Sequence, residues 1–293
     1  MYRPPIRKWM PSSNGRSPAD LNNKTTTITQ YLQSMRRTTM TTTNCPKFTD
    51  AIKTSVKNKI YRFLDGTARL SQFAVIFGST GRGKSFHSKK WAEEHPGTIY
   101  VRARTGSTMT RLRRQISSTV FRSESMSASA IVKYFLDNPG TVLIIDEAVH
   151  LIGNYNYSAT NALDSVRDLY DEVSEAGGRM GVAMIFTEYS LERLRKCRMS
   201  SFLAQFINRF DNHLDLGTKI SFPYEIKPTV EARIPGASPE ILDFFRQFSD
   251  IRSVHKRIDV AKYIETYTKQ PVSLPMLRKI QEQFETGIYK DEL

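Results

Sequence analysis

Residues 73–85 read FAVIFGSTGRGKS, five apolar residues followed at once by a glycine-rich loop that ends in lysine and serine. A short apolar run of this kind is typical of a buried strand, and the pattern from Lys84 to Glu94 predicts a helix directly after the loop. Glycines let consecutive backbone N–H groups converge on phosphate oxygens at the N-terminus of such a helix. The stretch therefore predicts a strand, a phosphate-binding loop (the P-loop, residues 78–85) and a helix.

The last two residues of the P-loop carry its chemistry. Lys84 is expected to reach the β and γ phosphates of ATP, and Ser85 to offer its hydroxyl to magnesium. The alternative is a glycine-rich turn that binds nothing, but the strand before the loop and the helix after it favour nucleotide binding. The residues expected to contact ATP are Gly78, Ser79, Thr80, Gly81, Arg82, Gly83, Lys84 and Ser85.

A second apolar run ends in two carboxylates, because residues 143–147 read LIIDE. A carboxylate at the end of a strand, here Asp146, can hold the coordination shell of Mg²⁺, and Glu147 can orient or deprotonate the attacking water. An acidic pair is also common where a strand simply ends. Downstream of a P-loop, the pair predicts hydrolysis of ATP to ADP and phosphate rather than transfer of phosphate to a second substrate.

Strand and helix patterns alternate along the middle of the chain. Further strands are predicted at residues 99–101, 142–145, 182–186 and 213–216, and an early helix is expected to begin after Thr49 as N-cap and to end at Gly66. Such alternation predicts an α/β fold with a parallel sheet flanked by helices. Only helical patterns follow Pro239, notably residues 251–267 and 274–284. We therefore expect a basic N-terminal arm (1–48), an ATPase core (49–222) and a small C-terminal helical lid (223–293).

The composition limits the choice of partner and compartment. The chain has 43 Lys and Arg against 29 Asp and Glu, a net charge of +14, which favours a polyanion such as nucleic acid over the alternative of an inert basic surface. Two cysteines are too few for a disulfide framework, and no apolar stretch or signal-like start predicts a membrane span or export. We expect a soluble cytoplasmic protein, in which the terminal KDEL, residues 290–293, is coincidental.

Arginines gather after the second predicted strand, with the hydroxyl-bearing Thr105, Ser107, Thr108 and Thr110 between them. Contacts of this kind to phosphates position a protein on DNA without reading its sequence. We therefore predict a site for double-stranded DNA here; the alternative is a solvated basic helix face. The N-terminal arm either joins that contact or is a solvated tail. The arginines are Arg102, Arg104, Arg111, Arg113 and Arg114.

From about residue 50 onward, the chain resembles the AAA+ ATPases that regulate DNA transposition, the family of the phage Mu B protein and TnsC. The resemblance rests on the P-loop strand, residues 75–85, and on residues 144–151, which read IIDEAVHL. By this resemblance Thr187 is sensor 1, where the family usually has asparagine, and Arg209, within residues 208–210, is the arginine finger. Arg252, within residues 250–254, is likewise sensor 2.

The resemblance also implies a fold and a function. It implies an AAA+ P-loop NTPase core with a helical lid, and an active site completed by a neighbouring subunit. The relatives bind DNA without sequence preference, form ATP-dependent helical filaments on it, and recruit or stimulate a transposase. Unlike the Mu protein, this chain shows no helix-turn-helix pattern in its first 50 residues. The alternatives are an ATPase of the helicase-loader type, a DNA-coating scaffold for which ATP is only a structural ligand, and a metabolic P-loop kinase, which the acidic pair and the basic charge disfavour.

Overall fold

The computed structural model describes residues 52–104, 107–122, 127–151, 161–187 and 209–286. All of them belong to one compact unit, Lys47–Leu293, which is distinct from Met1–Pro46. The predicted N-terminal arm lies outside the described residues, as does Thr49. The prediction that Thr49 caps the first helix is wrong, because that helix begins at Ser55 and its N-cap is Thr54, whose hydroxyl accepts from the N–H of Lys57 at 3.1 Å.

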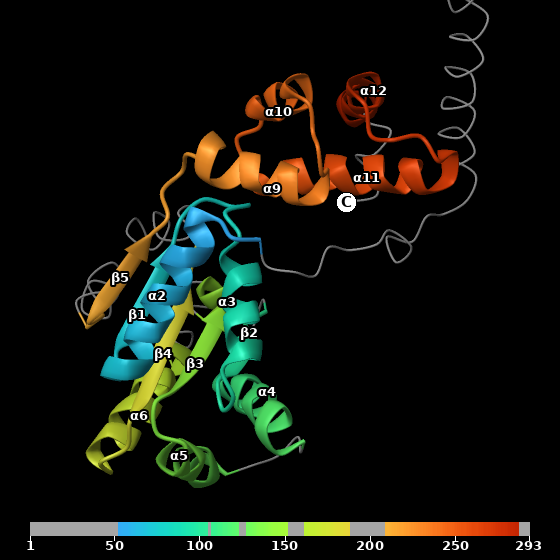
Figure 1. The fold of residues 1–293 in the computed structure, drawn as a ribbon. Helices are drawn as coiled ribbons and strands as arrows, with labels where there is room; N and C mark the ends of the chain where they lie inside the picture. Colours follow the sequence, from blue (N-terminus) through green and yellow to red (C-terminus); the bar gives the residue numbers. More distant parts are fainter. Residues whose placement is uncertain (1–51, 105–106, 123–126, 152–160, 188–208, 287–293) are drawn as a thin grey trace, which may run out of the picture. The chain divides into compact units, whose positions relative to one another are not determined.

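Five parallel strands form one sheet in the order β2-β3-β4-β1-β5 (Figure 1). The predicted parallel α/β sheet is therefore confirmed. Parallel strands end at the same edge, so the segments after β1, β3 and β4 meet there, the edge at which α/β sheets bind ligands. The strands are β1 Phe73–Phe77, β2 Ile99–Arg102, β3 Thr141–Asp146, β4 Met180–Ile185 and β5 Asn212–Asp215.

Helices cover both faces of the sheet because successive strand residues point to opposite faces. On one face, α2 (Ser55–Leu70) and α3 (Lys84–Glu94) pack on the side chains of Ile76, Ile144 and Ile185. On the other, α4 (Met109–Phe121), α5 (Ala128–Asp137) and α6 (Asn161–Glu175) pack on the alternate residues of the same strands. The result is a three-layer arrangement with α2 lying along the front of the sheet in Figure 1.

The prediction that the first helix ends at Gly66 is wrong, since α2 runs from Ser55 to Leu70. A glycine within a helix costs about 1 kcal/mol relative to alanine. Leu64 and Thr67, on either side of it, are fully buried against the sheet, and this packing outweighs the local preference. The helix ends instead at Ser71, which adopts the left-handed conformation with φ 51°.

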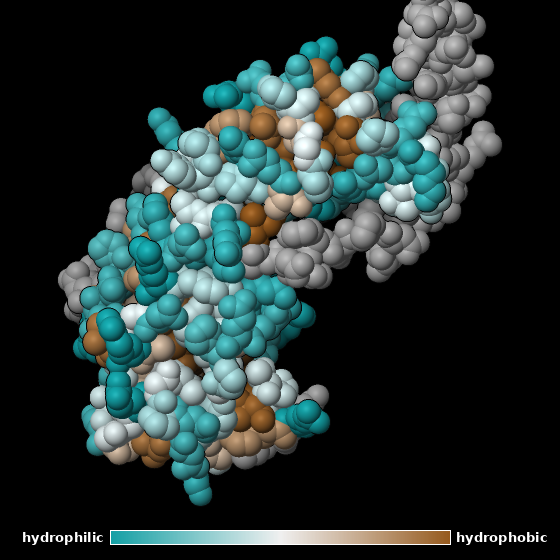
Figure 2. Space-filling model, in the orientation of Figure 1, coloured by the Kyte–Doolittle hydropathy of each residue, from teal (hydrophilic) through white to brown (hydrophobic). Residues whose placement is uncertain are grey.

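Past β5, only helices follow in the described part of the chain. They are the π-helix Phe222–Ile226, α9 (Lys227–Arg233), α10 (Pro239–Arg246), α11 (Ile251–Thr268) and α12 (Leu274–Glu285). Figure 2 shows apolar residues gathered where α10 and α12 face each other, and Phe245, Leu277 and Ile280 are fully buried. The helices predicted at 251–267 and 274–284 are confirmed to within one residue. None of the described helices is both long and apolar enough to cross a membrane.

Candidate active site

The P-loop joins β1 to α3 with a backbone that glycine alone adopts readily. Gly83, the N-cap of α3, has φ 78° and therefore lies in the left-handed region that L side chains rarely occupy. Because glycine has no side chain, Gly83 forms no capping hydrogen bond with the first N–H groups of α3. These N–H groups are therefore left to bind a ligand. Such a helix N-terminus attracts anions through its N–H groups and its dipole. The local geometry is that of a phosphate cradle.

Lys84 is buried and lies over this cradle. Its Nζ donates hydrogen bonds to the carbonyl oxygens of Gly78, at 2.7 Å, and Ser79, at 2.8 Å. Burial lowers the pKa of Lys84 to about 8, although the carboxylates of Asp146 and Glu147 act in the opposite direction. Two carbonyl oxygens therefore hold the ammonium group that should meet the phosphates. The carboxylates of Asp146 and Glu147 only partly offset the cost of burying its charge.

Asp146 is 2% exposed and accepts three hydrogen bonds. Its Oδ1 accepts from the Ser85 hydroxyl at 3.0 Å and from the backbone N–H of Glu147 at 2.9 Å, and its Oδ2 accepts from the Tyr100 hydroxyl at 2.7 Å. Burial first, and then the Asp146 carboxylate, raise the pKa of Tyr100, which keeps this hydroxyl a donor. The Asp146 carboxylate is thus fixed in orientation beside Ser85.

This pair of oxygen ligands fits Mg²⁺. Magnesium prefers oxygen and is usually held by one or two carboxylates together with substrate phosphates and water. Among the described residues, no group of three or more His, Cys, Asp or Glu could hold a metal on its own. A magnesium ion would therefore need Ser85, Asp146 and the phosphates of a bound nucleotide together.

Glu147 has a strained backbone at the end of β3. Its φ is 52°, a conformation that costs a non-glycine residue of the order of 1 kcal/mol or more. The other described non-glycine residues with positive φ are the C-caps of α2, α4 and α11, where this conformation is usual. Glu147 also lies 3.5 Å from the exposed guanidinium of Arg102 at the end of β2. The predicted catalytic carboxylate is thus paired with one of the arginines predicted to bind DNA.

A cavity of about 710 Å³ connects these groups, a volume within the usual range for ligand sites. Most of the P-loop from Thr80 to Ser85, both carboxylates, Thr187 and Arg252 line it. Gly78 and Ser79 are not among the lining residues, although they accept from Lys84. Arg209 does not line the cavity either; it is exposed in the turn before β5, and its neighbour Asn208 lies outside the described residues.

The lining of the cavity also contains His87, Arg233, His255 and Asp259, which the sequence did not suggest. Arg233 of α9 donates to Nδ1 of His255, at 2.8 Å, and to the carboxylate of Asp259. Burial, and for His255 also the Arg233 cation, lowers the pKa of His87 and of His255 to about 4, so both rings are neutral. No sequence pattern could have found this set, because its members come from α3, α9 and α11.

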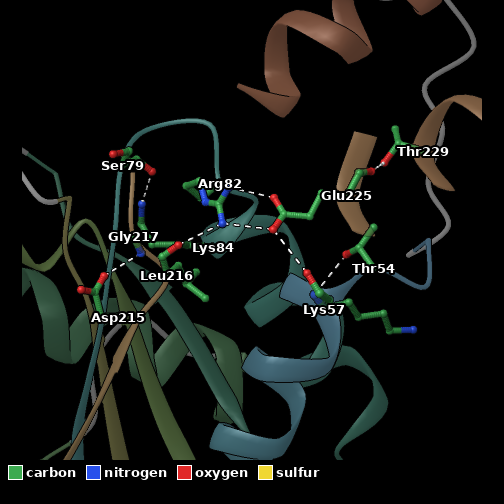
Figure 3. Close-up of polar contacts among 11 residues, drawn as sticks. Thr54, Lys57, Ser79, Arg82, Lys84, Asp215, Leu216, Gly217, Glu225 and Thr229 are labelled. Atoms are coloured by element: carbon green, nitrogen blue, oxygen red, sulfur yellow. Dashed lines mark hydrogen bonds and ion pairs between the residues drawn. The ribbon is translucent and has the colours of Figure 1, made fainter. Parts of the chain in front are cut away.

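Arg82 has a different environment from the rest of the P-loop (Figure 3). Its Nη1 donates to Oε2 of Glu225 at 2.8 Å, and its Nη2 donates to Oε1 of Glu225 at 3.2 Å and to the carbonyl oxygen of Leu216 at 2.9 Å. The side chains of Arg82 and Glu225 are only 4% and 9% exposed. Removing one partner of such a buried pair typically costs about 3–5 kcal/mol. The guanidinium predicted to contact nucleotide is therefore already engaged by Glu225, at the start of the C-terminal helices.

The remaining arginines of the predicted DNA site are exposed on or before α4. Arg104, Arg111, Arg113 and Arg114 form no ion pair with any described residue, whereas Arg102 pairs with Glu147. At about 100° per residue, Arg111 and Arg114 share one side of α4 and Arg113 lies further round the exposed surface. The first turn of α4 contains Arg111 and no acidic residue. This is opposite to the pattern that stabilises a helix N-terminus, so the Arg111 charge does not stabilise α4 through the helix dipole.

Comparison with known proteins agrees with this geometry. The AAA domain family matches residues 67–194, which contain the P-loop, Asp146, Glu147 and Thr187. No curated protein matches the sequence significantly.

Solved structures of similar fold include a HORMA:CdnC:Trip13 complex from E. coli MS115-1, with 12% identity over 77% of this chain and 86% of that chain and a TM-score of 0.48. The Thermotoga maritima RuvB Holliday junction branch migration motor has 14% identity over 78% of this chain and 67% of that chain, with a TM-score of 0.47. The replication initiator DnaA bound to AMPPCP and single-stranded DNA has 11% identity over 80% of this chain and 67% of that chain, with a TM-score of 0.49.

The match over residues 67–194 covers the P-loop, the acidic pair and the central parallel strands that hold them together. Residues 67–194 therefore match the AAA domain family, and the chain has the AAA+ P-loop NTPase fold.

Proposed function

We propose that this chain is an ATPase that hydrolyses ATP to ADP and phosphate with the help of magnesium. The observation that carries the proposal is the convergence of Lys84, Ser85, Asp146 and Glu147 on one cavity, with the Ser85 hydroxyl 3.0 Å from the Asp146 carboxylate. A P-loop alone would explain nucleotide binding. The adjacent Glu147 adds a group that can act on water, which favours turnover over a structural role for ATP.

Each side chain has a role that follows from its position. Lys84 neutralises charge on the β and γ phosphates, while Ser85 and Asp146 hold magnesium, which supplies further neutralisation of the phosphate oxygens. Glu147 orients and deprotonates the attacking water, and Thr187, in the same cavity, hydrogen-bonds the γ-phosphate or that water. Arg252, near the start of α11, adds a second cation whose charge already contributes to lowering the pKa of Lys84.

Two substitutions separate binding from hydrolysis. Lys84→Ala should weaken ATP binding, measured by isothermal titration, because the cation that meets the phosphates is removed. Glu147→Gln should keep the affinity and abolish phosphate release, since glutamine retains the shape but not the base. Retention of normal turnover by the Glu147 variant would remove it as the catalytic group and favour a scaffold that uses ATP only as a structural ligand.

We further propose that the chain binds double-stranded DNA through Arg102, Arg104, Arg111, Arg113 and Arg114 and assembles on it in the presence of ATP. The support is the exposure of these arginines, the absence of ion pairs to described residues for all but Arg102, and the net charge of +14. Arg209, exposed and away from the cavity of its own chain, would complete the site of the next subunit as an arginine finger. ATP bound between subunits would then bring many weak phosphate contacts together on one duplex.

Salt and nucleotide dependence test the DNA proposal. Each phosphate contact contributes about −0.9 to the slope of log affinity against log salt. The double variant Arg111→Ala/Arg114→Ala should bind more weakly and with a shallower slope, and the wild type should bind tightly with a slowly hydrolysed ATP analogue and weakly with ADP. An unchanged slope in the double variant would place the DNA elsewhere on the surface, and equal affinity with both nucleotides would rule out the ATP dependence.

We propose, finally, that the assembled protein selects the target in DNA transposition and recruits or activates a transposase. This step rests on the resemblance of residues 75–85 and 144–151 to the AAA+ regulators of transposition. The test is a strand-transfer reaction with a candidate transposase, with and without this protein and ATP. Stimulation that requires both supports the role. Loading of a replicative helicase onto DNA without any effect on strand transfer would favour the helicase-loader alternative.

A further inference from the structure

Glu225 connects four parts of the chain that are far apart in sequence (Figure 3). Its carboxylate binds Arg82 of the P-loop through both oxygens and accepts from the Ser55 hydroxyl at the start of α2, at 3.3 Å. Its backbone carbonyl accepts from the Thr229 hydroxyl of α9 at 2.6 Å. Arg82 in turn donates to the carbonyl of Leu216, just past β5. The contact therefore links the P-loop, the sheet, α2 and the first C-terminal helices.

The bonds of Arg82 make it a stiff connection. A guanidinium is a planar fork, and here it is fixed on one side by a bidentate carboxylate and on the other by a backbone carbonyl. Because both side chains are buried, water does not replace these bonds when they loosen. A displacement of the P-loop at Arg82 must therefore move Glu225 or leave an unpaired charge in the interior, which is strongly unfavourable.

Glu225 lies in a segment with an unusual backbone conformation. It belongs to the π-helix Phe222–Ile226, a form that is rare and often marks functional positions in helices. The P-loop touches the C-terminal helices at a second point as well. A side chain on Gly81 would come within 3.0 Å of Asp250, the residue that caps α11 through the N–H of Ser253. The π-helix that leads into α9 and the N-cap of α11 thus both contact the loop expected to bind phosphates.

We propose that Glu225 is a positioning residue that couples nucleotide at the P-loop to the C-terminal helices by way of Arg82. The inference rests on the proposed binding of ATP at the P-loop. Bound triphosphate fixes the loop backbone, Arg82 transmits that position to Glu225, and the π-helix passes it to α9. By linkage the effect is reciprocal, so the arrangement of the C-terminal helices also sets the affinity for ATP.

Amide hydrogen exchange measured on the whole chain, with and without saturating ATP and magnesium, tests the coupling. In the wild type, ATP should slow exchange in α9 and at the start of α11. In Glu225→Gln the charge is lost but the size is kept, and the slowing in α9 should fall by about tenfold, within the usual range of coupling between sites. Reciprocity predicts that ATP affinity falls by a similar factor, a relation that a purely structural ion pair would not produce.

A double variant keeps the test decisive if Glu225→Gln unfolds. Arg82→Met/Glu225→Leu replaces the ion pair by apolar side chains, an exchange that buried pairs often tolerate. The double variant should fold and still lose the ATP-dependent slowing in α9. The matched control is Glu231→Gln, which breaks the exposed pair with Lys227 on α9 itself, 3.7 Å apart, and should respond to ATP like the wild type.

The outcomes separate the coupling from the ATPase proposal. If wild-type protein binds ATP but both Glu225 variants show its full slowing in α9, the coupling is wrong and the ATPase proposal stands. If the wild type binds no ATP at all, while Lys84→Ala behaves identically, both proposals fail together.

Discussion

Replacing Tyr100 by phenylalanine removes one hydroxyl from the support of Asp146 and leaves the ring in place. That hydroxyl donates to Oδ2 of Asp146 at 2.7 Å, and because Asp146 is only 2% exposed, bulk water is a poor replacement for the lost donor. A hydrogen bond to a charged group contributes about 1.5–3 kcal/mol. Mutation of a residue that orients a metal-binding carboxylate typically weakens metal binding by about 10- to 100-fold, and this factor agrees with that energy. We therefore expect Tyr100→Phe to raise the magnesium concentration for half-maximal ATP hydrolysis by this factor.

The assay is phosphate release at fixed ATP over a magnesium titration, together with thermal unfolding of the same samples. Tyr134→Phe is the matched control. It also removes a partly buried tyrosine hydroxyl bonded to an oxygen, the carbonyl of Gly97 at 2.9 Å, but that bond lies away from the cavity. The control should lose some stability and keep the wild-type magnesium dependence. An unchanged magnesium requirement in Tyr100→Phe, with wild-type turnover, would refute the view that this hydroxyl orients Asp146 for the metal.

Three further predictions concern charge. The pKa of Lys84 is lowered to about 8, and phosphates bind its protonated form better. ATP affinity measured by titration should therefore be steady below pH 8 and fall above it. The weaker ATP binding of Lys84→Met should not change at this pH. The pKa values of His87 and His255 are lowered from 6.5 to about 4, so between pH 6.5 and 4 the unfolded chain binds more protons than the folded chain. As pH falls over this range, each ring should lower the free energy of unfolding, measured by chemical denaturation, by up to about 3 kcal/mol. The variant His255→Gln should show a weaker dependence of this free energy on pH. If Arg209 acts on a neighbouring subunit, mixing inactive Arg209→Ala with inactive Lys84→Ala should restore part of the ATPase activity, and no recovery despite demonstrated co-assembly would contradict the role in trans.

Local patterns in the sequence were sufficient for the main parts of the fold. The apolar run at residues 73–77, the glycines after it and the acidic pair at 146–147 each lie within one short segment, and their chemistry depends on neighbours in the chain. The strands and the two long C-terminal helices were likewise predicted to within about two residues, because hydrophobic periodicity is a local property. Gly66 shows the limit of that reasoning, since burial of Leu64 and Thr67 against the sheet outweighs the local preference of glycine.

Contacts between distant segments depended on the tertiary structure. Strand β2 lies beside β3, and this brings Tyr100 and Arg102 to the two carboxylates. The order of the strands is decided by packing over the whole sheet. The sequence placed Arg82 in the P-loop but gave no sign of Glu225, because the two are 143 residues apart and meet only when the C-terminal helices dock. A motif determines which groups follow one another along the chain, whereas burial and pairing of remote elements determine which of them touch.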